Sequence, residues 1–270
     1  MKILSIQDIS CFGQCSLTVA LPIISSYGIE TAILPSAVLS THTSGFKNFT
    51  VLDLTDEMEK IINHWIDENI KYDAIYTGYI GNVKQFEYIK IAKEKILNNE
   101  GLLIVDPAMA DHGKLYPALD ESIILGMKDI CSIADYIIPN ITEACFLTDS
   151  NYLEEYNEDY IDDLLNKLYT LGAKNIVLTG VSFEKGKIGA MYYDGVNKVS
   201  CFIDKLEKSY HGTGDIFSSV IVANILNNVD IKNNLIDAVE FVAKSIEETM
   251  NDDNHKYGVK FEKVLKAKCQ

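Results

Sequence analysis

A short turn near residue 212 has the residue types to handle a phosphate group. In the stretch YHGTGDIFSS, residues 210–219, two glycines flank Thr213, Asp215 follows directly, and an apolar run with helical spacing begins. Free backbone N–H groups at a helix start behind such a turn bind anions. Asp215, with an ordinary pKa of about 4, would be ionised at neutral pH and could accept a hydroxyl proton. The alternative is that Asp215 only caps the helix, and this stretch alone leaves both interpretations open.

Three further carboxylates suggest a cation. Asp106 lies at the end of a predicted strand, and Asp111 and Glu143 follow predicted strands. Oxygen ligands of this kind suit a hard cation that retains waters, such as magnesium on a polyphosphate. Taken singly, each could equally be a solvated or capping carboxylate.

These residues are embedded in an alternation of short β-like runs and longer helical ones. The predicted strands cover residues 2–7, 30–35, 73–78, 102–107, 135–140 and 175–180. The predicted helices cover 15–26, 55–66, 84–98, 122–131 and 159–171, a segment ending near 226, and about 234–250. Thr55 is the expected N-cap of the second helix, because Asp56 and Glu57 follow it in the first turn.

This alternation predicts a mostly parallel sheet with helices on both faces. Residues 187–203 break the rhythm, since two strand-like runs flank an Asp194-Gly195 turn, which is typical of an antiparallel edge hairpin. No repeat or linker divides the chain, so residues 1–270 are expected to form one domain. Ligands of open α/β sheets bind at the carboxyl ends of the strands, where this chain places small, polar or acidic residues repeatedly.

Composition narrows the class of partner. Twenty-four basic and thirty-nine acidic residues give a net charge of -15, which repels nucleic acid and anionic membranes. The six cysteines are scattered and are expected to be free, buried thiols, with no zinc-site spacing. No segment has the roughly 20 apolar residues of a membrane span, and a cytoplasmic protein is expected.

Several motifs together resemble the ribokinase-like (PfkB-like) kinases, and within them the vitamin B6 kinases. NITE at 140–143 and GTGD at 212–215 resemble the superfamily. The narrower resemblance rests on motifs in the same order along the chain: LSIQD at 4–8, LSTHTSGF at 39–46, YTGYIGN at 76–82, VDPAMAD at 105–111 and HGTGDIFSS at 211–219. The resemblance implies a three-layer α/β/α sandwich, ATP as phosphoryl donor, Mg²⁺ with a K⁺ or Na⁺ ion, and a homodimer.

The resemblance also implies a role for each matching residue. Asp215 would take the proton from the hydroxymethyl group of the pyridine ring, and Gly212, Thr213 and Gly214 would form the anion hole. Asp106, Asn140 and Glu143 would act on the ATP phosphates through magnesium, and Asp111 would belong to the alkali-cation site. The remaining nucleotide contacts would be Thr179, Gly180, Glu207 and Lys208. The pyridine ring would be surrounded by Asp8, His42, Thr43 and Tyr79.

Two residues depart from the family pattern, Asp8 at the substrate and Ala110 in a loop that alanine is expected to tighten. Position 8 is serine in much of the family, and aspartate here is expected to alter the preference among B6 vitamers. Ala110 stands where glycine is usual.

Two alternatives to B6 phosphorylation remain: a hydroxymethylpyrimidine kinase of thiamine synthesis, and a non-catalytic vitamin or nucleotide sensor on the same fold. The intact Asp215, Glu143 and glycines argue against the sensor.

Overall fold

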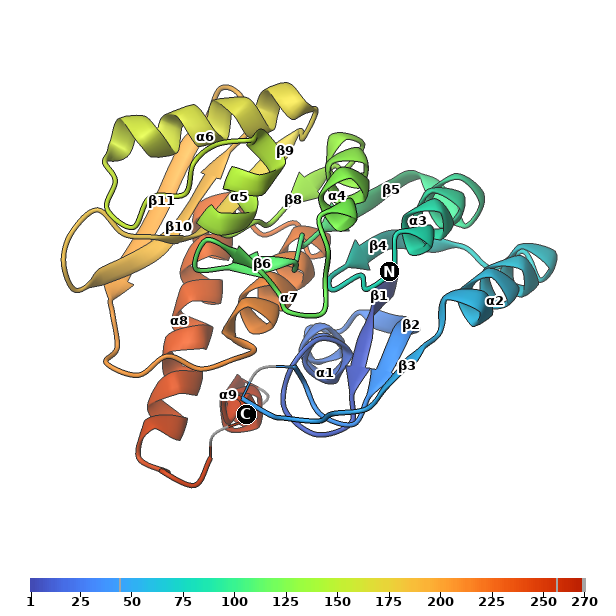
Figure 1. Cartoon of the computed structure of the whole chain (residues 1–270), viewed down its shortest axis with the longest axis horizontal. Coiled ribbons are helices and arrows are strands. Elements are labelled where there is room, and N and C mark those ends of the chain that lie inside the picture. The colour runs from blue at the N-terminus through green and yellow to red at the C-terminus, as the bar shows by residue number, and fades with distance from the viewer. Residues whose placement is uncertain (44, 256, 269–270) are drawn as a thin grey trace.

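Nine strands among the described residues form one sheet in the computed structural model (Figure 1). The structure describes residues 1–43, 45–255 and 257–268, so Ser44 of the predicted substrate loop lies outside it. In spatial order the strands are β11 (Lys198–Asp204), β10 (Lys187–Tyr193), β9 (Asn175–Val181), β8 (Tyr136–Ile137), β5 (Leu97–Val105), β4 (Tyr72–Thr77), β1 (Lys2–Ser10), β2 (Glu30–Leu39) and β3 (Val51–Asp53).

The six strands from β9 to β2 run parallel, and both edges are antiparallel. At one edge β10 and β11 form the predicted hairpin, whose turn is closed by Asp194 accepting the N–H groups of Val196 at 2.9 Å and Asn197 at 2.6 Å. At the other edge lies β3, which the sequence analysis did not predict. The predicted mostly parallel sheet with an antiparallel edge hairpin is confirmed.

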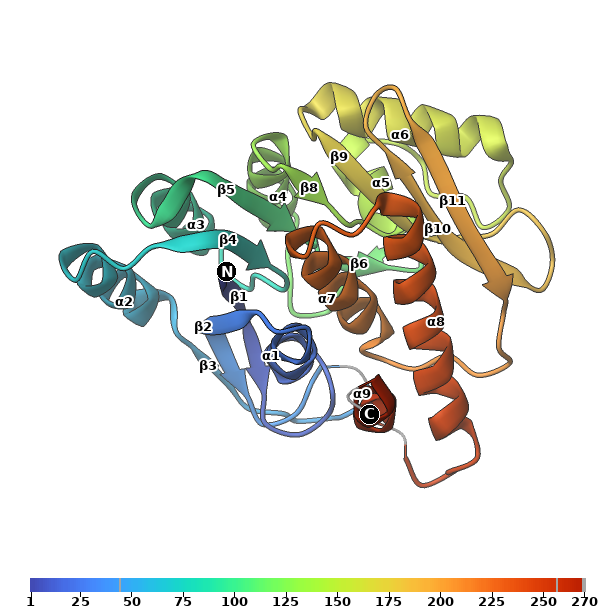
Figure 2. The ribbon, with the colours of Figure 1, turned by 180° about the vertical axis from the view of Figure 1, so that it is seen from behind.

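Helices cover both faces of this sheet, which confirms the predicted three layers (Figures 1 and 2). One face carries α2 (Thr55–Asp67), α3 (Lys84–Lys95), α4 (Ser122–Ser132), α5 (Ile141–Thr148) and α6 (Glu158–Leu171). The other carries α1 (Leu17–Ser26), α7 (Thr213–Leu226), α8 (Ile231–Met250) and α9 (Phe261–Lys268). Strand residues alternate between the two cores: Leu4 and Ile6 pack on one face, and Ile3 on the other.

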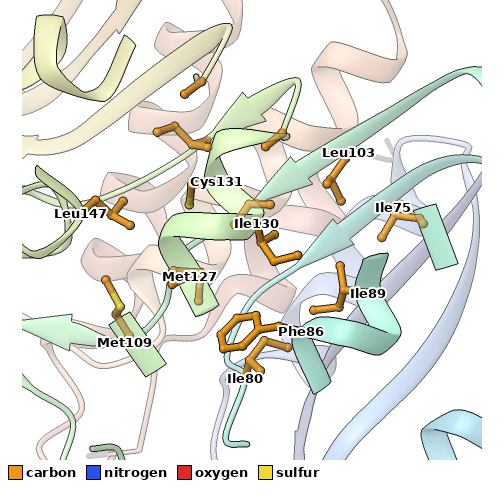
Figure 3. Close-up of a cluster of buried hydrophobic side chains, with 14 of the residues drawn as sticks. Ile75, Ile80, Phe86, Ile89, Leu103, Met109, Met127, Ile130, Cys131 and Leu147 are labelled. Atoms are coloured by element: carbon orange, nitrogen blue, oxygen red, sulfur yellow. The ribbon is translucent and has the colours of Figure 1, made fainter. Parts of the chain in front are cut away.

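The core under α3 and α4 is closely packed (Figure 3). Phe86 and Ile89 of α3 meet Met127 and Ile130 of α4 above the strands. A Cβ at Gly126 would lie 2.1 Å from Cδ2 of Phe86, so glycine permits this helix contact. A two-stranded sheet, β6 (Ala110–Asp111) with β7 (Lys114–Leu115), stands apart from the main sheet.

Several local predictions were wrong, among them the predicted strand 135–140, which is reduced to Tyr136–Ile137. Thr55 is the first residue of α2 rather than its cap, and its N–H is accepted by Asp53 at 2.7 Å. Helix α3 ends at Lys95, three residues before the predicted end, because β5 begins at Leu97. Within the described ranges, no helix combines the length and the apolar character needed to cross a membrane.

Candidate active site

A cavity of about 570 Å³ opens at the carboxyl ends of the parallel strands. It brings together most of the predicted site residues: Asp8, His42, Thr43, Tyr79, Asp106, Asp111, Asn140, Glu143, Thr179, Gly212, Thr213, Gly214 and Asp215. Three predicted nucleotide contacts, Gly180, Glu207 and Lys208, are not among its lining residues. The ammonium group of Lys208 instead donates to the carbonyl of Met250 at 2.7 Å and to Asp253 at 3.1 Å.

The glycine turn begins α7 and requires glycine at its first position. Gly212 is the N-cap with φ of 80°, and a Cβ there would lie 2.0 Å from the carbonyl oxygen of Gln14. A Cβ at Gly214 would meet no atom within 4 Å. Since the first N–H groups of a helix have no intrahelical acceptor, the turn offers donors at the cavity wall.

Asp215 is the third residue of α7, so it is not the N-cap. Burial raises its pKa to about 7, with a further contribution from the nearby Asp106 carboxylate. The nearby backbone N–H of Ser16 and the thiol of Cys15 lower the pKa of Asp215 and partly oppose that rise. The expectation of an ordinary pKa near 4 was therefore wrong, because it ignored desolvation and the neighbouring carboxylates.

Asp106 lies at the end of β5, beneath α7. Its carboxylate is 7% exposed and accepts a hydrogen bond of 2.7 Å from the hydroxyl of Ser218. Burial raises the pKa of Asp106 to about 6. Two carboxylates, Asp106 and Asp215, thus share the cavity with their charged forms disfavoured.

Asn140 and Glu143 form a capping box at the start of α5. The side chain of Asn140 accepts the N–H of Glu143 at 2.9 Å, and the carboxylate of Glu143 accepts the N–H of Asn140 at 2.9 Å. Glu143 also accepts the N–H of Met109 at 3.1 Å. Burial and the charge of Asp106 raise the pKa of Glu143. The carboxylate therefore ties α5 to the segment after β5.

Asp111 lies at the rim of the same cavity. It forms β6 with Ala110, whose carbonyl accepts from Asn140 at 2.8 Å, and its carboxylate is 3.5 Å from the imidazole of His112. Across the described part of the chain, no three His, Cys, Asp or Glu side chains are grouped so that they could hold a metal ion.

The opposite wall of the cavity holds a buried carboxylate. Asp8 is 4% exposed and accepts from the hydroxyl of Ser10 at 3.1 Å. Burial raises its pKa, while hydrogen bonds from Ser16 and Ser10 lower it. Burial and the charge of the nearby Asp8 raise the pKa of Tyr79 to about 12, so its phenol stays a hydrogen-bond donor.

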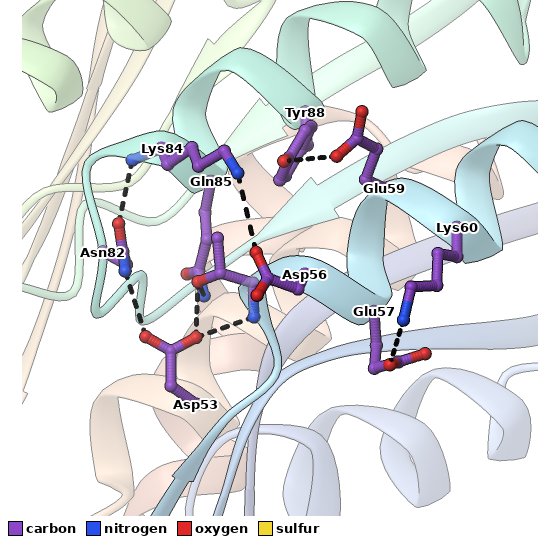
Figure 4. A network of polar contacts seen from close by, with 10 residues as sticks. Asp53, Asp56, Glu57, Glu59, Lys60, Asn82, Lys84, Gln85 and Tyr88 are labelled. Atoms are coloured by element: carbon purple, nitrogen blue, oxygen red, sulfur yellow. Dashed lines mark hydrogen bonds and ion pairs between the residues drawn. The ribbon is translucent and has the colours of Figure 1, made fainter.

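A polar network holds the Tyr79 segment in place (Figure 4). Asn82 donates to Asp53 at 3.0 Å, and Gln85 donates to Thr55 at 2.9 Å and to the carbonyl of Ser36 at 3.0 Å. The hydroxyl of Ser36 in turn donates to the carbonyl of Tyr79 at 3.3 Å. The turn after β4 is thereby fastened to β2 and α2.

His42 and Thr43 complete this wall. His42 is 4% exposed, and its ring lies 5.6 Å from that of His211, centroid to centroid. Burial and the nearby His211 lower the pKa of His42. A Cβ at Gly13 would lie 2.1 Å from the His42 ring, so the loop after β1 packs directly on it.

Sequence reasoning missed several of the residues that line this cavity. Cys15, expected to be a buried structural thiol, lines the cavity together with Ser16 and Ser218. Ser218 could have been found, because a position three after Asp215 lies on the same helix face. Ser16 has φ of 53°, unusual for a non-glycine residue, and nothing in its sequence context predicts that.

Comparison with known proteins gives a consistent set of matches. Residues 21–260 match the family described as phosphomethylpyrimidine kinase. The curated pyridoxal kinase of Dictyostelium discoideum is 28% identical over 268 residues, covering 93% of this chain and 87% of that protein.

Two solved structures superpose over nearly the whole chain. A candidate phosphomethylpyrimidine kinase from Bacteroides thetaiotaomicron, solved with pyridoxal, is 34% identical with a TM-score of 0.92, covering 100% of this chain and 96% of that one. The pyridoxal kinase of Lactobacillus plantarum is 30% identical with a TM-score of 0.90, covering 98% of this chain and 95% of that one.

Proposed function

Because this chain belongs to the phosphomethylpyrimidine kinase family, we propose that it transfers the γ-phosphoryl group of ATP to the hydroxymethyl group of a vitamin B6 vitamer. The products would be pyridoxal 5'-phosphate or the corresponding phosphates of pyridoxine and pyridoxamine. The observation that carries this proposal is the meeting of Asp215 and the Gly212–Gly214 turn in one cavity at the strand ends.

The family description by itself leaves hydroxymethylpyrimidine as an alternative substrate. Two observations favour B6 over the pyrimidine. Curated relatives over most of the chain are pyridoxal kinases, and the similar Bacteroides protein was solved with pyridoxal. The pyrimidine therefore remains a competitor to be assayed alongside the B6 vitamers.

In this proposal Asp215 is the general base and the glycine turn holds the transferred phosphoryl group. The Asp215 carboxylate accepts the proton of the attacking hydroxymethyl group, whose oxygen bonds to the γ-phosphorus while ADP leaves. N–H groups at the start of α7 donate to the equatorial oxygens, where charge builds up. Catalysis then rests on positioning and charge neutralisation, since phosphoryl transfer needs no covalent work from the protein.

The nucleotide would lie over the Asp106, Asn140 and Glu143 side of the cavity. Two buried carboxylates with raised pKa values fit a nearby cation, because a positive charge favours their ionised forms. Magnesium bound there would neutralise phosphate charge and would draw most of its ligands from phosphate oxygens and water. Asp111 would contact a K⁺ or Na⁺ ion. Thr179, Gly180, Glu207 and Lys208 would lie along the nucleotide.

The B6 ring would lie between Asp8, His42, Thr43 and Tyr79. The low exposure of Asp8 and His42 supports this assignment, because a largely dry wall suits a flat aromatic ring. Asp8 would accept a hydrogen bond from a ring substituent or a protonated ring nitrogen.

We extend the proposal to the state of the protein in the cell: a single kinase domain over residues 1–270 that acts in the cytoplasm as a homodimer. Use of ATP supports a cytoplasmic site of action. The dimer is supported by the edge strand β3, where Val51 is 55% exposed and Leu52 is 61% exposed.

The deciding experiment is a coupled ADP-release assay with ATP and Mg²⁺. Pyridoxal, pyridoxine, pyridoxamine and hydroxymethylpyrimidine are offered separately. Turnover on a B6 vitamer supports the proposal, and turnover on the pyrimidine alone moves the protein to thiamine synthesis. No turnover on any of the four contradicts the proposed kinase activity and favours a sensor.

A further inference from the structure

The loop between β1 and α1, residues 11–16, lies between the glycine turn and the chain that follows α8. We call residues 257–264 the C-terminal segment. Figures 1 and 2 show α9, which contains its second half, beside the loops that follow β1 and β2. None of these C-terminal residues lines the cavity. The contacts on the two sides of the loop point to a role for the segment in catalysis.

On its inner side the loop touches the catalytic turn directly. The carbonyl oxygen of Gln14 occupies the space that a side chain at position 212 would need, and a Cβ there would also lie 3.4 Å from the sulfur of Cys15. The backbone of Ser16 and the thiol of Cys15 lie beside the carboxylate of Asp215 and lower its pKa. A shift of Gln14 would therefore move both the anion-binding turn and the groups beside the base.

On its outer side the same residue meets the C-terminal segment. The N–H of Gln14 donates to the carbonyl of Tyr257 at 3.1 Å, and its side-chain amide donates to the carboxylate of Glu262. Gly258 has φ of 127°, and a Cβ there would lie 2.8 Å from the Cβ of Gln14. The rings of Phe12 and Tyr257 lie 4.6 Å apart, centroid to centroid.

The C-terminal segment is itself firmly anchored, so it can hold the loop. Val259, Phe261 and Val264 are buried in the core that α8 shares with α1 and α7. The N–H of Lys260 donates to the hydroxyl of Thr249 at 2.8 Å, and its ammonium pairs with Asp252 at 2.5 Å.

We propose that Gln14 and Glu262 are positioning residues: through them the C-terminal segment fixes the loop after β1, and the loop fixes the glycine turn and Asp215. This inference rests on the proposed kinase function. It assigns a role in the chemical step to residues that touch neither the cavity nor a reacting atom.

The first test is the substitution Gly258→Ala, whose methyl group would press on Gln14. Its matched control is Gly186→Ala, since Gly186 also has positive φ, 82°, but no atom within 4 Å of the added Cβ. For Gly258→Ala we expect kcat to fall about 10- to 100-fold, as for a misplacement of ~1 Å, with KM for ATP and vitamer nearly unchanged. A kcat equal to that of the control, or a loss confined to KM, would overturn the proposal.

The second test isolates the side-chain contact. Glu262→Ala and Gln14→Ala should each lower kcat. The kcat of the double variant should be no lower than that of the less active single variant. Glu262→Gln should keep near-normal turnover, because its amide oxygen still accepts the hydrogen bond from Gln14. Additive losses, or no rescue by Glu262→Gln, would contradict the role assigned to this pair.

A third readout separates this proposal from the proposed function. Alkylation of Cys15, followed by mass spectrometry with Cys201 as internal reference, reports the loop without any turnover. Gly258→Ala should speed the reaction at Cys15 relative to Gly186→Ala. An unchanged alkylation rate in Gly258→Ala would overturn the anchoring role even if the wild type is an active kinase. If the wild type has no kinase activity but Cys15 still reacts faster in Gly258→Ala, the anchoring role stands and only the proposed kinase function fails.

Discussion

The hydroxyl of Ser218 donates a 2.7 Å hydrogen bond to the carboxylate of Asp106. Ser218 lies one turn after Asp215 on α7, whereas Asp106 directly follows β5 at the centre of the sheet. One helix therefore carries the proposed base and also holds the carboxylate that raises the pKa of that base. The proposed substrate side and the proposed nucleotide side of the cavity are thus linked through α7.

Replacing Asp215 with asparagine should strongly reduce turnover and leave nucleotide binding intact. The amide keeps the size of the side chain but cannot accept the hydroxyl proton, so kcat should fall by about 10²–10⁴. Turnover measured by ADP release, with calorimetric Kd for an ATP analogue as control, checks this. Near-normal kcat would remove Asp215 from the role of base.

The rate should depend on pH through the same carboxylate. With a pKa of about 7, Asp215 must lose its proton to act, so kcat/KM should rise about tenfold per pH unit below that value and level off above it. A profile flat from pH 5 to 8 would contradict the raised pKa.

The free energy of unfolding should fall as pH rises, whereas kcat/KM rises. The folded-state pKa of Asp215, about 7, exceeds the ordinary 3.8, so its contribution to folding is full below about pH 4 and is lost as pH rises through 7. In thermal melts, Asp215→Asn should therefore raise Tm more at pH 8 than at pH 4, by about 2–4 °C for each kcal/mol recovered. An equal change at both pH values would count against this account.

Gly214→Ala separates the shape of the turn from its stability. The added methyl group meets no atom within 4 Å, and alanine favours the helix by up to about 1 kcal/mol, so Tm should stay or rise slightly. In the cavity the same methyl group would crowd the phosphoryl group, and kcat/KM for ATP should fall at least about tenfold. Full activity would place the phosphate elsewhere.

Asp8→Ser tests the substrate wall. Removing a buried carboxylate should change the ratio of kcat/KM among pyridoxal, pyridoxine and pyridoxamine by about tenfold or more, because cationic groups lose a partner. KM for ATP is the internal control. A selective loss of ATP binding would put Asp8 in the nucleotide pocket instead.

Leu52→Lys tests the edge strand as a dimer contact. A charge on β3 should block edge-to-edge pairing and convert the dimer to monomer in light scattering. Val196→Lys is a matched control, since Val196 is 87% exposed in the hairpin turn at the opposite edge. A dimer that survives Leu52→Lys would have another interface.

The sequence supported the sheet and most of the site because both follow short-range patterns. The Asp194-Gly195 turn, the apolar strands and the polar residues after them predicted the architecture and the cavity wall. The sequence analysis does not predict helix α5, because this helix has only eight residues and its N-cap, Asn140, is the last residue of the predicted strand 135–140. The pKa of Asp215 could not be predicted, since it depends on burial and on Asp106, which lies 109 positions earlier in the chain (215 − 106). The partner of Lys208, Asp253, is a tertiary contact that no local pattern indicates.

The order of strands in the sheet has a consequence for how the protein is made. From β1 outward, the neighbours are β4, β5, β8, β9, β10 and β11, which is also their order along the chain. A chain emerging from the ribosome can therefore add each new strand to an edge that already exists, without opening a finished pair. Because Asp215 follows β11, the proposed base joins the cavity only after every strand has been synthesised. A partly made chain thus has a growing sheet but no means of transferring a phosphoryl group.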